Sequence, residues 1–483
     1  METFYMMLFG FQALLAAVLE YGNRIGNDNK HVGASNEFLA FRNNYLIVYS
    51  LMMAGDWLQG PYVYALYQHY GFERGDIGRL FIAGFGSSMI FGTIVGSLAD
   101  KHGRKRAALI YVCTYTFGCF TKHFNSFWIL FTGRIFCGVA TSLLYSAFES
   151  WLVAEHFKRG FNADWLGGTF SQAVFLGNGL MAIVAGLGAH TLVETFSVGP
   201  VAPFDAAATV LVIGGVIIYS TWSENYGDSS RDSNAIEGFS KAAKLIMSEP
   251  KIALLGAMQA LFEGSMYTFV FLWTPALSPN GEKIPHGMVF ACFMVASMVG
   301  SAIAGRLLSN NSKFKVEKYM QVVFGLAACC LFVPVLYHHG EAGDDVDKLA
   351  DPEDGITFDG KLQLAAFCAF EGMVGVFWPS MMTMRSAYVP EEMRSTIINF
   401  FRIPLNLFVC VVLYNVSSFP LSTMFGMCSF FLIVCLFCQR QFASIVHHEQ
   451  AGSHFDEDEA AAGKAVAMAK LVDGGQSALD SSA

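Results

Sequence analysis

The chain has 483 residues, of which 54% are hydrophobic and only 14% are charged, and it contains 45 Phe. These proportions exclude an ordinary water-soluble globular protein, which carries about 25% charged residues. The net charge of −9 comes mainly from polar segments such as 341–359 and 456–459, and it gives no indication of a nucleic-acid partner. We therefore expect most of the chain to lie in a lipid bilayer.

Thirteen apolar segments have the length of a membrane span, because a bilayer core of roughly 30 Å needs about 20 apolar residues in a helix. They lie at 3–21, 43–70, 77–99, 107–123, 126–152, 168–190, 201–221, 251–276, 286–308, 317–337, 361–384, 394–416 and 421–440. The sequence thus predicts an all-α polytopic membrane protein.

The polar stretch 222–250 divides these segments, with seven before it and six after it. The predicted organisation is an N-terminal anchor helix and loop (1–42), a six-helix half (43–221), a cytoplasmic linker (222–250), a second six-helix half (251–442) and a cytoplasmic polar tail (443–483). The first segment has no basic residue before it, which favours a retained anchor over the alternative, a cleaved signal peptide.

The two halves repeat each other weakly. A shift of 209 places Gly78, Phe81, Ser88, Met89, Ile94, Gly96 and Leu98 on Gly287, Phe290, Ser297, Met298, Ile303, Gly305 and Leu307. A shift of 207 places Asp56 on Glu263. Chance similarity between apolar segments is the alternative. A true repeat predicts two parallel halves related by an axis along the membrane normal.

Orientation follows from Lys and Arg, which concentrate in short cytoplasmic loops. With the basic loop 101–106 inside, most Lys and Arg between the segments fall on the same side. The linker and the tail are then cytoplasmic. The acidic segment 341–359 lies outside the cell or in an organelle lumen.

The most informative motif is the stretch Gly96–Arg106, which ends one apolar segment and precedes the next. It is similar to the loop signature of the major facilitator superfamily, Gly-x-x-x-Asp-x-x-Gly-Arg-Lys/Arg. The resemblance implies a conformational motif formed by Gly96, Asp100, Gly103, Arg104 and Lys105. In the second half Ser309 stands where the repeat predicts an Asp, so we expect an asymmetric latch at Asp100. A plain basic loop is the alternative.

Other motifs point to one branch of the superfamily. Gly133-Arg134-x-x-x-Gly138 resembles its second signature, and further stretches resemble the eukaryotic molybdate-anion transporter family over about residues 40–442. These stretches are Asp56–Tyr62, Phe148–Trp151, Leu261–Glu263, Leu272–Pro275 and Phe401–Pro404.

The resemblance implies the major facilitator fold, with 12 core helices in two parallel six-helix halves plus one extra N-terminal transmembrane helix. It also implies a multi-pass, monomeric carrier in the lipid bilayer, which takes up molybdate by alternating access without a cofactor. The plasma membrane is the expected location, and an organelle membrane is the alternative.

Six ionisable residues within the apolar segments carry most of the functional information, since such residues are costly in a membrane. They are Asp56, Arg134, Glu149, Glu263, Glu371 and Arg402. An Arg fork donates two parallel hydrogen bonds to an oxoanion, so we expect Arg402 and Arg134 to bind the substrate. The alternative is that each Arg only pairs with a neighbouring acid.

The acidic residues Asp56, Glu149, Glu263 and Glu371 are the candidates for coupling and gating, with protons as the coupling ion. Further donors to a small anion are expected from Tyr62, Tyr64, Asn178 and Asn406. The alternative for each of these residues is an ordinary contact between helices.

Two other functions stay open: a carrier of another solute, such as a sugar or an organic anion, and a non-transporting sensor or scaffold. An enzyme is not expected, because the chain lacks the catalytic motifs of hydrolases and phosphate-binding loops. The eleven Cys lack the spacing of a metal site.

Overall fold

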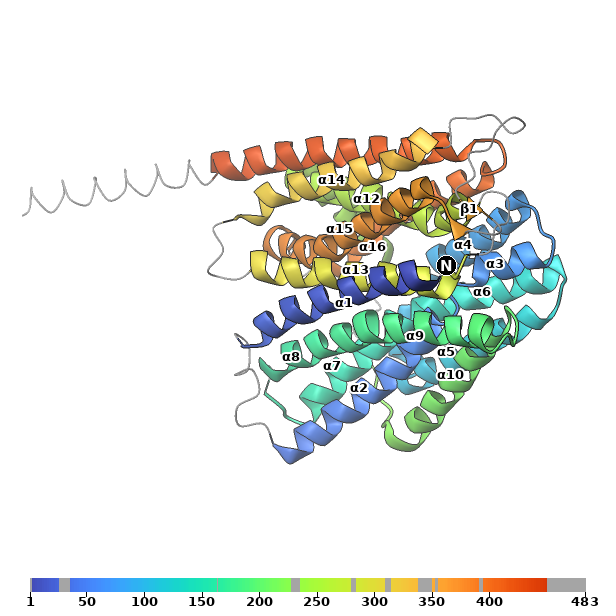
Figure 1. The fold of residues 1–483 in the computed structure, drawn as a ribbon. Coiled ribbons are helices and arrows are strands. Elements are labelled where there is room, and N and C mark those ends of the chain that lie inside the picture. Colours follow the sequence, from blue (N-terminus) through green and yellow to red (C-terminus); the bar gives the residue numbers. More distant parts are fainter. Residues whose placement is uncertain are drawn as a thin grey trace, which may run out of the picture.

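The computed structural model is a bundle of long helices (Figure 1). It describes residues 2–25, 35–162, 164–226, 235–278, 284–308, 314–337, 350–351, 355–390 and 394–449. In this part of the chain the strands are limited to an antiparallel pair, β1 (Ala350–Asp351) and β2 (Gly355–Ile356). The predicted all-α class is confirmed.

The helices before the polar linker are α1 (Glu2–Ile25), α2 (Asn36–Trp57), α3 (Val63–His69), α4 (Arg74–His102), α5 (Arg104–Phe120), α6 (Phe127–Leu144), α7 (Ala147–Lys158), α8 (Asp164–Val174), α9 (Met181–His190) and α10 (Ala202–Thr221). Those after its start are α11 (Ala235–Ser248), α12 (Pro250–Leu277), α13 (His286–Leu307), α14 (Val316–Tyr337), α15 (Phe358–Tyr388), α16 (Arg394–Tyr414) and a last helix, Leu421–Glu449.

Each of the thirteen expected segments coincides with helix. Eight helices in the described residues are long and apolar enough to cross a bilayer, or nine if α11 and α12, which meet at 104°, form one bent span. α5 has 17 residues, one fewer than the 18 residues taken as the minimum length of a span. The exact number of spans therefore stays a prediction.

Three of the expected spans are interrupted within the bundle. α2 and α3 are separated by a turn that holds Gly60 and Pro61, and α6 and α7 are separated at Tyr145 and Ser146. Between α8 and α9 lies a π turn, η2 (Phe175–Leu180). Such π turns are rare and often occur at functional sites.

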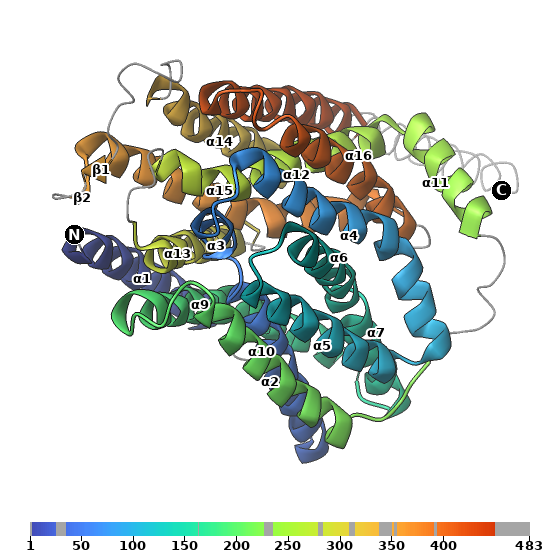
Figure 2. The ribbon, with the colours of Figure 1, turned by 90° about the vertical axis from the view of Figure 1, so that its right-hand side faces the viewer.

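Two groups of helices lie side by side, α2–α10 and α12 to the last helix (Figure 2). Within the first group α4 packs against α6, and within the second α13 packs against α15. Glycines permit this close approach. A Cβ on Gly300 or Gly375 would meet the backbone of the facing helix at Gly372 or Ser297, and a Cβ on Gly138 would meet the backbone of α4.

The two groups meet through α4 with α16 and through α9 with α13. α1 packs against α13 and lies beside α9 in both views (Figures 1 and 2). We call the end of the bundle at the α4–α5 junction the Gly103 end, and the opposite end, where α9 connects to α10, the Gly199 end.

Candidate functional site

An ion cluster lies in the second group of helices. Glu263 of α12 is 1% exposed and forms a side-chain hydrogen bond with Gln259, one turn earlier. Nη1 of Arg385, from α15, donates to Oε1 of Gln259 at 2.9 Å. Arg402, from α16, is hydrogen-bonded to Tyr267 and interacts electrostatically with Glu263. Two Arg therefore surround one carboxylate, which leaves this cluster with a net positive charge.

The sequence of α12 explains how this cluster forms. Gln259, Glu263 and Tyr267 follow one another at intervals of four residues, which places them on one face of a helix. α15 and α16 both pack against α12. Their Arg side chains thereby reach the same face.

A second polar cluster lies in the first group. The hydroxyl of Tyr115, from α5, donates to the carboxylate of Asp56, near the end of α2. Arg134 of α6 interacts electrostatically with Asp56. Its Nε donates to the carbonyl of Leu80 at 3.3 Å, and its guanidinium lies 4.9 Å from the centre of the Phe81 ring. Arg134 is thus held against α4, and its predicted role as an anion ligand stays a prediction.

Tyr145 connects the two clusters. It occupies the break between α6 and α7 and interacts electrostatically with Asp56 and Tyr49 of the first group and with Tyr267 and Arg402 of the second. Its side chain is 46% exposed, although it faces helices of both groups. The clusters therefore border a solvent-accessible space between the two groups.

The remaining predicted site residues are dispersed. Glu149 of α7 is exposed and interacts electrostatically with Tyr49. Asn178 is exposed in η2, and Asn406, one turn after Arg402, is half-buried. Glu371 of α15 is 5% exposed and neighbours Cys368, which is hydrogen-bonded to Gln12 of α1.

Tyr62 and Tyr64 belong to the contact between the groups at the Gly199 end. The Tyr62 ring lies 5.7 Å from the ring of His286 in α13, between centroids, and its hydroxyl donates to Oε1 of Glu194 in its own group at 3.4 Å. The Tyr64 ring meets the Phe271 ring edge-on at 5.2 Å between centroids. Both Tyr side chains are at most 6% exposed.

Glycines complete the closure of this end. A Cβ on Gly78 of α4 would lie 2.7 Å from the carbonyl oxygen of Leu413 in α16. A Cβ on Gly287 of α13 would lie 2.6 Å from the carbonyl oxygen of Gly186 in α9. Backbones of opposite groups thus touch at both contacts.

At the Gly103 end the signature loop is bound to the segment after α10. Gly103 joins α4 and α5 with φ of 111°, a conformation that favours glycine. The Glu224 carboxylate accepts hydrogen bonds from the backbone N–H groups of Lys105 and Arg106 at 2.8 and 3.2 Å, and the Asn225 carbonyl accepts one from Arg104. The side chain of Asp100 and the surroundings of Gly96 lie outside the described part of the structure.

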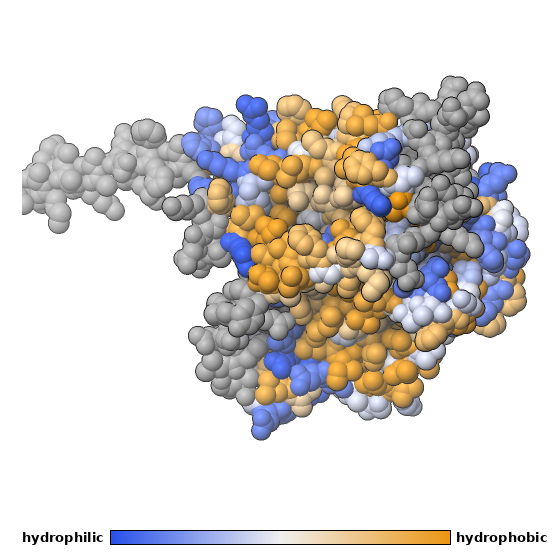
Figure 3. Space-filling model, viewed as in Figure 1, coloured by the Kyte–Doolittle hydropathy of each residue, from blue (hydrophilic) through white to orange (hydrophobic). Residues whose placement is uncertain are grey.

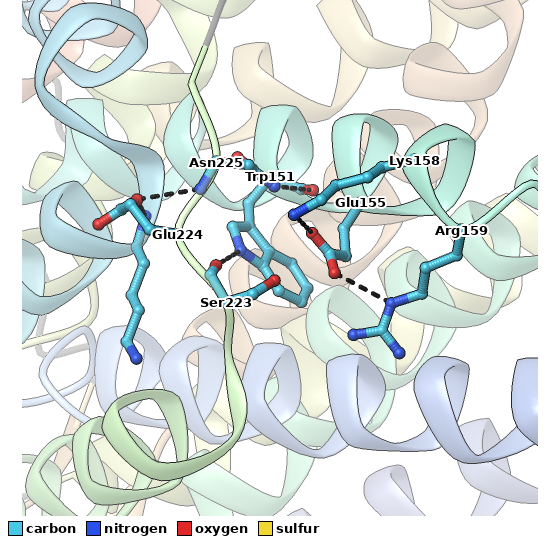
Figure 4. A network of polar contacts seen from close by, with 8 residues as sticks. Trp151, Glu155, Lys158, Arg159, Ser223, Glu224 and Asn225 are labelled. Carbon is cyan, nitrogen blue, oxygen red and sulfur yellow. Dashed lines mark hydrogen bonds and ion pairs between the residues drawn. The ribbon is translucent and has the colours of Figure 1, made fainter.

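The start of the linker is also bound to α7 (Figure 4). Trp222 stacks on Trp151 at 3.7 Å, and the Trp151 indole N–H donates to the carbonyl of Ser223 at 2.8 Å. Glu155 is paired with Arg159 at 3.0 Å. The α10 end, the signature loop and α7 therefore form one connected unit at the Gly103 end.

Five members of the two clusters are not among the residues predicted from the sequence: Gln259, Tyr267, Arg385, Tyr115 and Tyr145. The spacing of four residues around Glu263 is a signal that could have revealed Gln259 and Tyr267. The charge of Arg385 instead indicates a cytoplasmic loop. Among the described residues no group of three or more His, Cys, Asp or Glu could hold a metal ion.

Comparisons with known proteins show the family and the fold of the chain. The protein family described as sugar transporters with 12 transmembrane segments matches residues 3–367. The chain is 31% identical to the molybdate-anion transporter of Xenopus laevis, over 92% of this chain and 96% of that protein. It is 31% identical to that of Danio rerio over 78% and 79%.

Among solved structures, a mutant of the nucleoside transporter NupG matches with a TM-score of 0.65 at 12% identity, over 83% of this chain and 99% of that one. The D-xylose-proton symporter matches with a TM-score of 0.62 at 10% identity, over 83% and 97%. These matches show the fold. The chain belongs to the family of the molybdate-anion transporters, within the major facilitator superfamily.

Proposed function

We propose that this protein takes up molybdate by alternating access, with Arg402 as the main anion ligand. The observation that carries the proposal is the position of Arg402, which lies beside Tyr267 of its own group and interacts with Tyr145 of the opposite group. The family relationship supports it, since the relatives compared above are named molybdate-anion transporters. Their names also support a carrier rather than an enzyme.

The ion cluster suits a tetrahedral dianion. Arg402 and Arg385 bring two positive charges against the single negative charge of Glu263. Tyr145 and Tyr267 add hydroxyl donors, while Asn406 lies one helical turn from Arg402. Charged donors such as Arg form shorter and stronger hydrogen bonds to oxyanions than neutral groups do. Arg134 has its own partners on α4, so we assign it to holding Asp56 in place.

The same geometry supports proton coupling through Glu263. Glu263 competes with the anion for Arg402, so a proton on Glu263 frees Arg402 and strengthens anion binding. By linkage, a bound anion strengthens proton binding equally. Moving a dianion inward against about 100 mV costs about 4.6 kcal/mol, at about 2.3 kcal/mol per charge. A co-transported proton supplies part of this free energy.

We assign gating to Asp56, which the Tyr115 hydroxyl and Arg134 hold at the turn between α2 and α3. Glu149, our second candidate for gating, is exposed and interacts electrostatically with Tyr49. Glu371 is remote from Arg402 in its contacts, and we assign it a secondary role in coupling. The buried contacts at the Gly199 end support access to the two clusters from the Gly103 end in this conformation.

We further propose that the protein is a monomer in the plasma membrane and that its Gly103 end faces the cytoplasm. The surplus of Lys and Arg in the loops on that side supports this orientation. An antibody against a tag at the C-terminus should bind only after the cells are permeabilised. Binding to intact cells would reverse the orientation.

The test of the main proposal is molybdate uptake by cells that express the protein, detected by mass spectrometry, for wild type and Arg402→Lys at equal surface levels. Lys cannot reproduce the Arg fork, so uptake should fall at least about tenfold. Arg79→Lys is the matched control, because Arg79 is exposed and pairs with Asp76 of its own helix. Equal uptake by wild type and Arg402→Lys would remove Arg402 from the site.

A second candidate substrate is a sugar, because the matched family carries the description of sugar transporters. Gln259, Tyr145 and Tyr267 could bind hydroxyl groups. Competition separates the two: excess sulfate should reduce molybdate uptake, whereas hexoses and pentoses should not. Inhibition by a sugar alone would favour the second candidate.

A further inference from the structure

An apolar groove of about 400 Å³ lies outside the ion clusters, between α1, η2 with α9, and α13. This volume is within the range of about 300–1,000 Å³ of small-molecule sites. The residues that shape it are Ala13, Ala17, Phe175, Leu180, Val295 and Met298. The groove exists because α1 presents small Ala side chains where it passes the π turn.

The chemistry of the lining excludes a polar occupant. Apart from Glu20, every residue that lines the groove is apolar. An ordered water needs two to four polar partners, and apolar cavities remain dry. An oxoanion would find no Arg, Lys or hydroxyl there. The groove therefore fits a hydrocarbon.

The position of the groove identifies the source of that hydrocarbon. α1 carries a candidate membrane span, Thr3–Glu20. Its outer side exposes Met7, Phe11 and Leu14, each at least 66% exposed. Apolar residues form a broad band on this face of the molecule (Figure 3). The surroundings of the groove are thus the acyl chains of the bilayer, and Glu20 marks the end of the span.

We propose that the groove binds one acyl chain of a membrane phospholipid, which fills the space between α1 and the π turn. The same turn also packs against α2. The carbonyl of Gly177 accepts a hydrogen bond from the Trp57 indole at 3.2 Å, and Trp57 follows Asp56 in the chain. A chain in the groove thereby supports the element that positions Trp57.

The experiment uses the purified full chain in phosphatidylcholine nanodiscs that contain a small fraction of phosphatidylcholine with a diazirine in one acyl chain. After illumination and digestion, mass spectrometry should find adducts on the peptides that hold Phe175–Leu180 or Val295–Met298. These adducts should persist when unlabelled lipid is added just before illumination, whereas adducts on exposed Val322 and Leu326 of α14 should decrease.

Variants decide whether the groove holds the chain. Ala17→Phe fills the groove and removes room for at least two methylenes, so labelling there should fall at least about tenfold. Leu14→Phe is the matched control on the exposed side of the same helix and should label as wild type. If Ala17→Phe does not fold, Met298→Ala, which enlarges the groove, should retain or increase the labelling.

Equal labelling of the groove in wild type and Ala17→Phe, or labelling that exchanges as fast as that of α14, would overturn the proposal. The result does not depend on the transported solute. The labelling is measured without transport, so failure of the lipid site and failure of the proposed substrate are separate outcomes.

Discussion

Gly78 and Gly287, which are 209 residues apart, make matching contacts with the opposite group of helices. Gly78 of α4 lies against the backbone of Leu413, and Gly287 of α13 lies against the backbone of Gly186. The weak sequence repeat pairs the same two glycines. The repeat is therefore visible as two equivalent contacts that hold the Gly199 end closed.

Replacing either glycine by Ala should open this end. The added methyl group would stand within 2.7 Å of a backbone oxygen, and such overpacking costs about 1–3 kcal/mol. A Cys introduced at Tyr64, which is 6% exposed, should react faster with a membrane-impermeant thiol reagent in Gly287→Ala than in the parent. Gly86→Ala is the control, since nothing lies within 4 Å of its added Cβ. Equal reactivity in all three proteins would contradict the closure.

Loss of the Glu224 carboxylate should loosen the signature loop. It accepts the N–H groups of Lys105 and Arg106 at the start of α5, and removal of such a cap costs about 0.5–2 kcal/mol. In Glu224→Ala, backbone hydrogen exchange at 104–106 should accelerate about 2- to 30-fold. Glu249→Ala is the control, because Glu249 precedes α12 without a side-chain cap. Unchanged exchange would show that the carboxylate does not hold the loop.

The stack of Trp222 on Trp151 should anchor the linker. Both rings are at most 3% exposed, and truncation of a buried Trp to Ala costs about 3–5 kcal/mol. Trp222→Ala should therefore lower the thermal unfolding temperature of the purified protein by several degrees. Trp128→Ala is the control: it removes a ring that is 72% exposed and should leave the unfolding temperature nearly unchanged. Similar losses in both variants would argue against an anchoring role.

Removal of the Tyr267 hydroxyl should weaken anion binding. Hydrogen bonds to charged groups contribute about 1.5–3 kcal/mol, so Tyr267→Phe should raise the molybdate concentration for half-maximal uptake roughly tenfold or more. Tyr414→Phe is the control, since Tyr414 is 72% exposed. An unchanged half-maximal concentration would exclude the hydroxyl from the site.

Glu263→Gln should slow uptake and flatten its dependence on external pH. The amide keeps the shape of the side chain but cannot exchange the proton that, in our proposal, frees Arg402. Uptake should be measured between about pH 5.5 and 8, the range in which proton-coupled groups titrate, with Glu249→Gln as control, because Glu249 is exposed. If wild-type uptake is itself independent of pH, proton coupling is wrong.

Long apolar segments made the helices predictable, because a bilayer requires about 20 apolar residues for each span. Interruptions were not predictable in the same way. The turn at Gly60 and Pro61 has a sequence signal, since Pro breaks a helix. The break at Tyr145 and Ser146 has no comparable signal. The π turn at Phe175–Leu180 holds Gly177 and Gly179, but its form depends on packing against neighbouring helices.

The candidate site was predicted in part. Rare charges within apolar segments pointed to Glu263 and Arg402, and the structure brings these two together. It places Tyr62 and Tyr64 instead at the closed Gly199 end, so their predicted role as ligands stays untested. Arg385 was missed for a different reason. A basic residue near the end of a span is typical of a cytoplasmic loop, although here its long side chain reaches back into the bundle to Gln259.

The sequence by itself determined the membrane class, the repeat and the few charges that matter, because the cost of polar groups in lipid is local. Only the tertiary structure decided which charges meet, that Glu224 binds the signature loop, that glycines 209 residues apart close one end, and that α1 leaves a groove. These relationships depend on the distances between helices far apart in the chain, which a linear pattern does not specify.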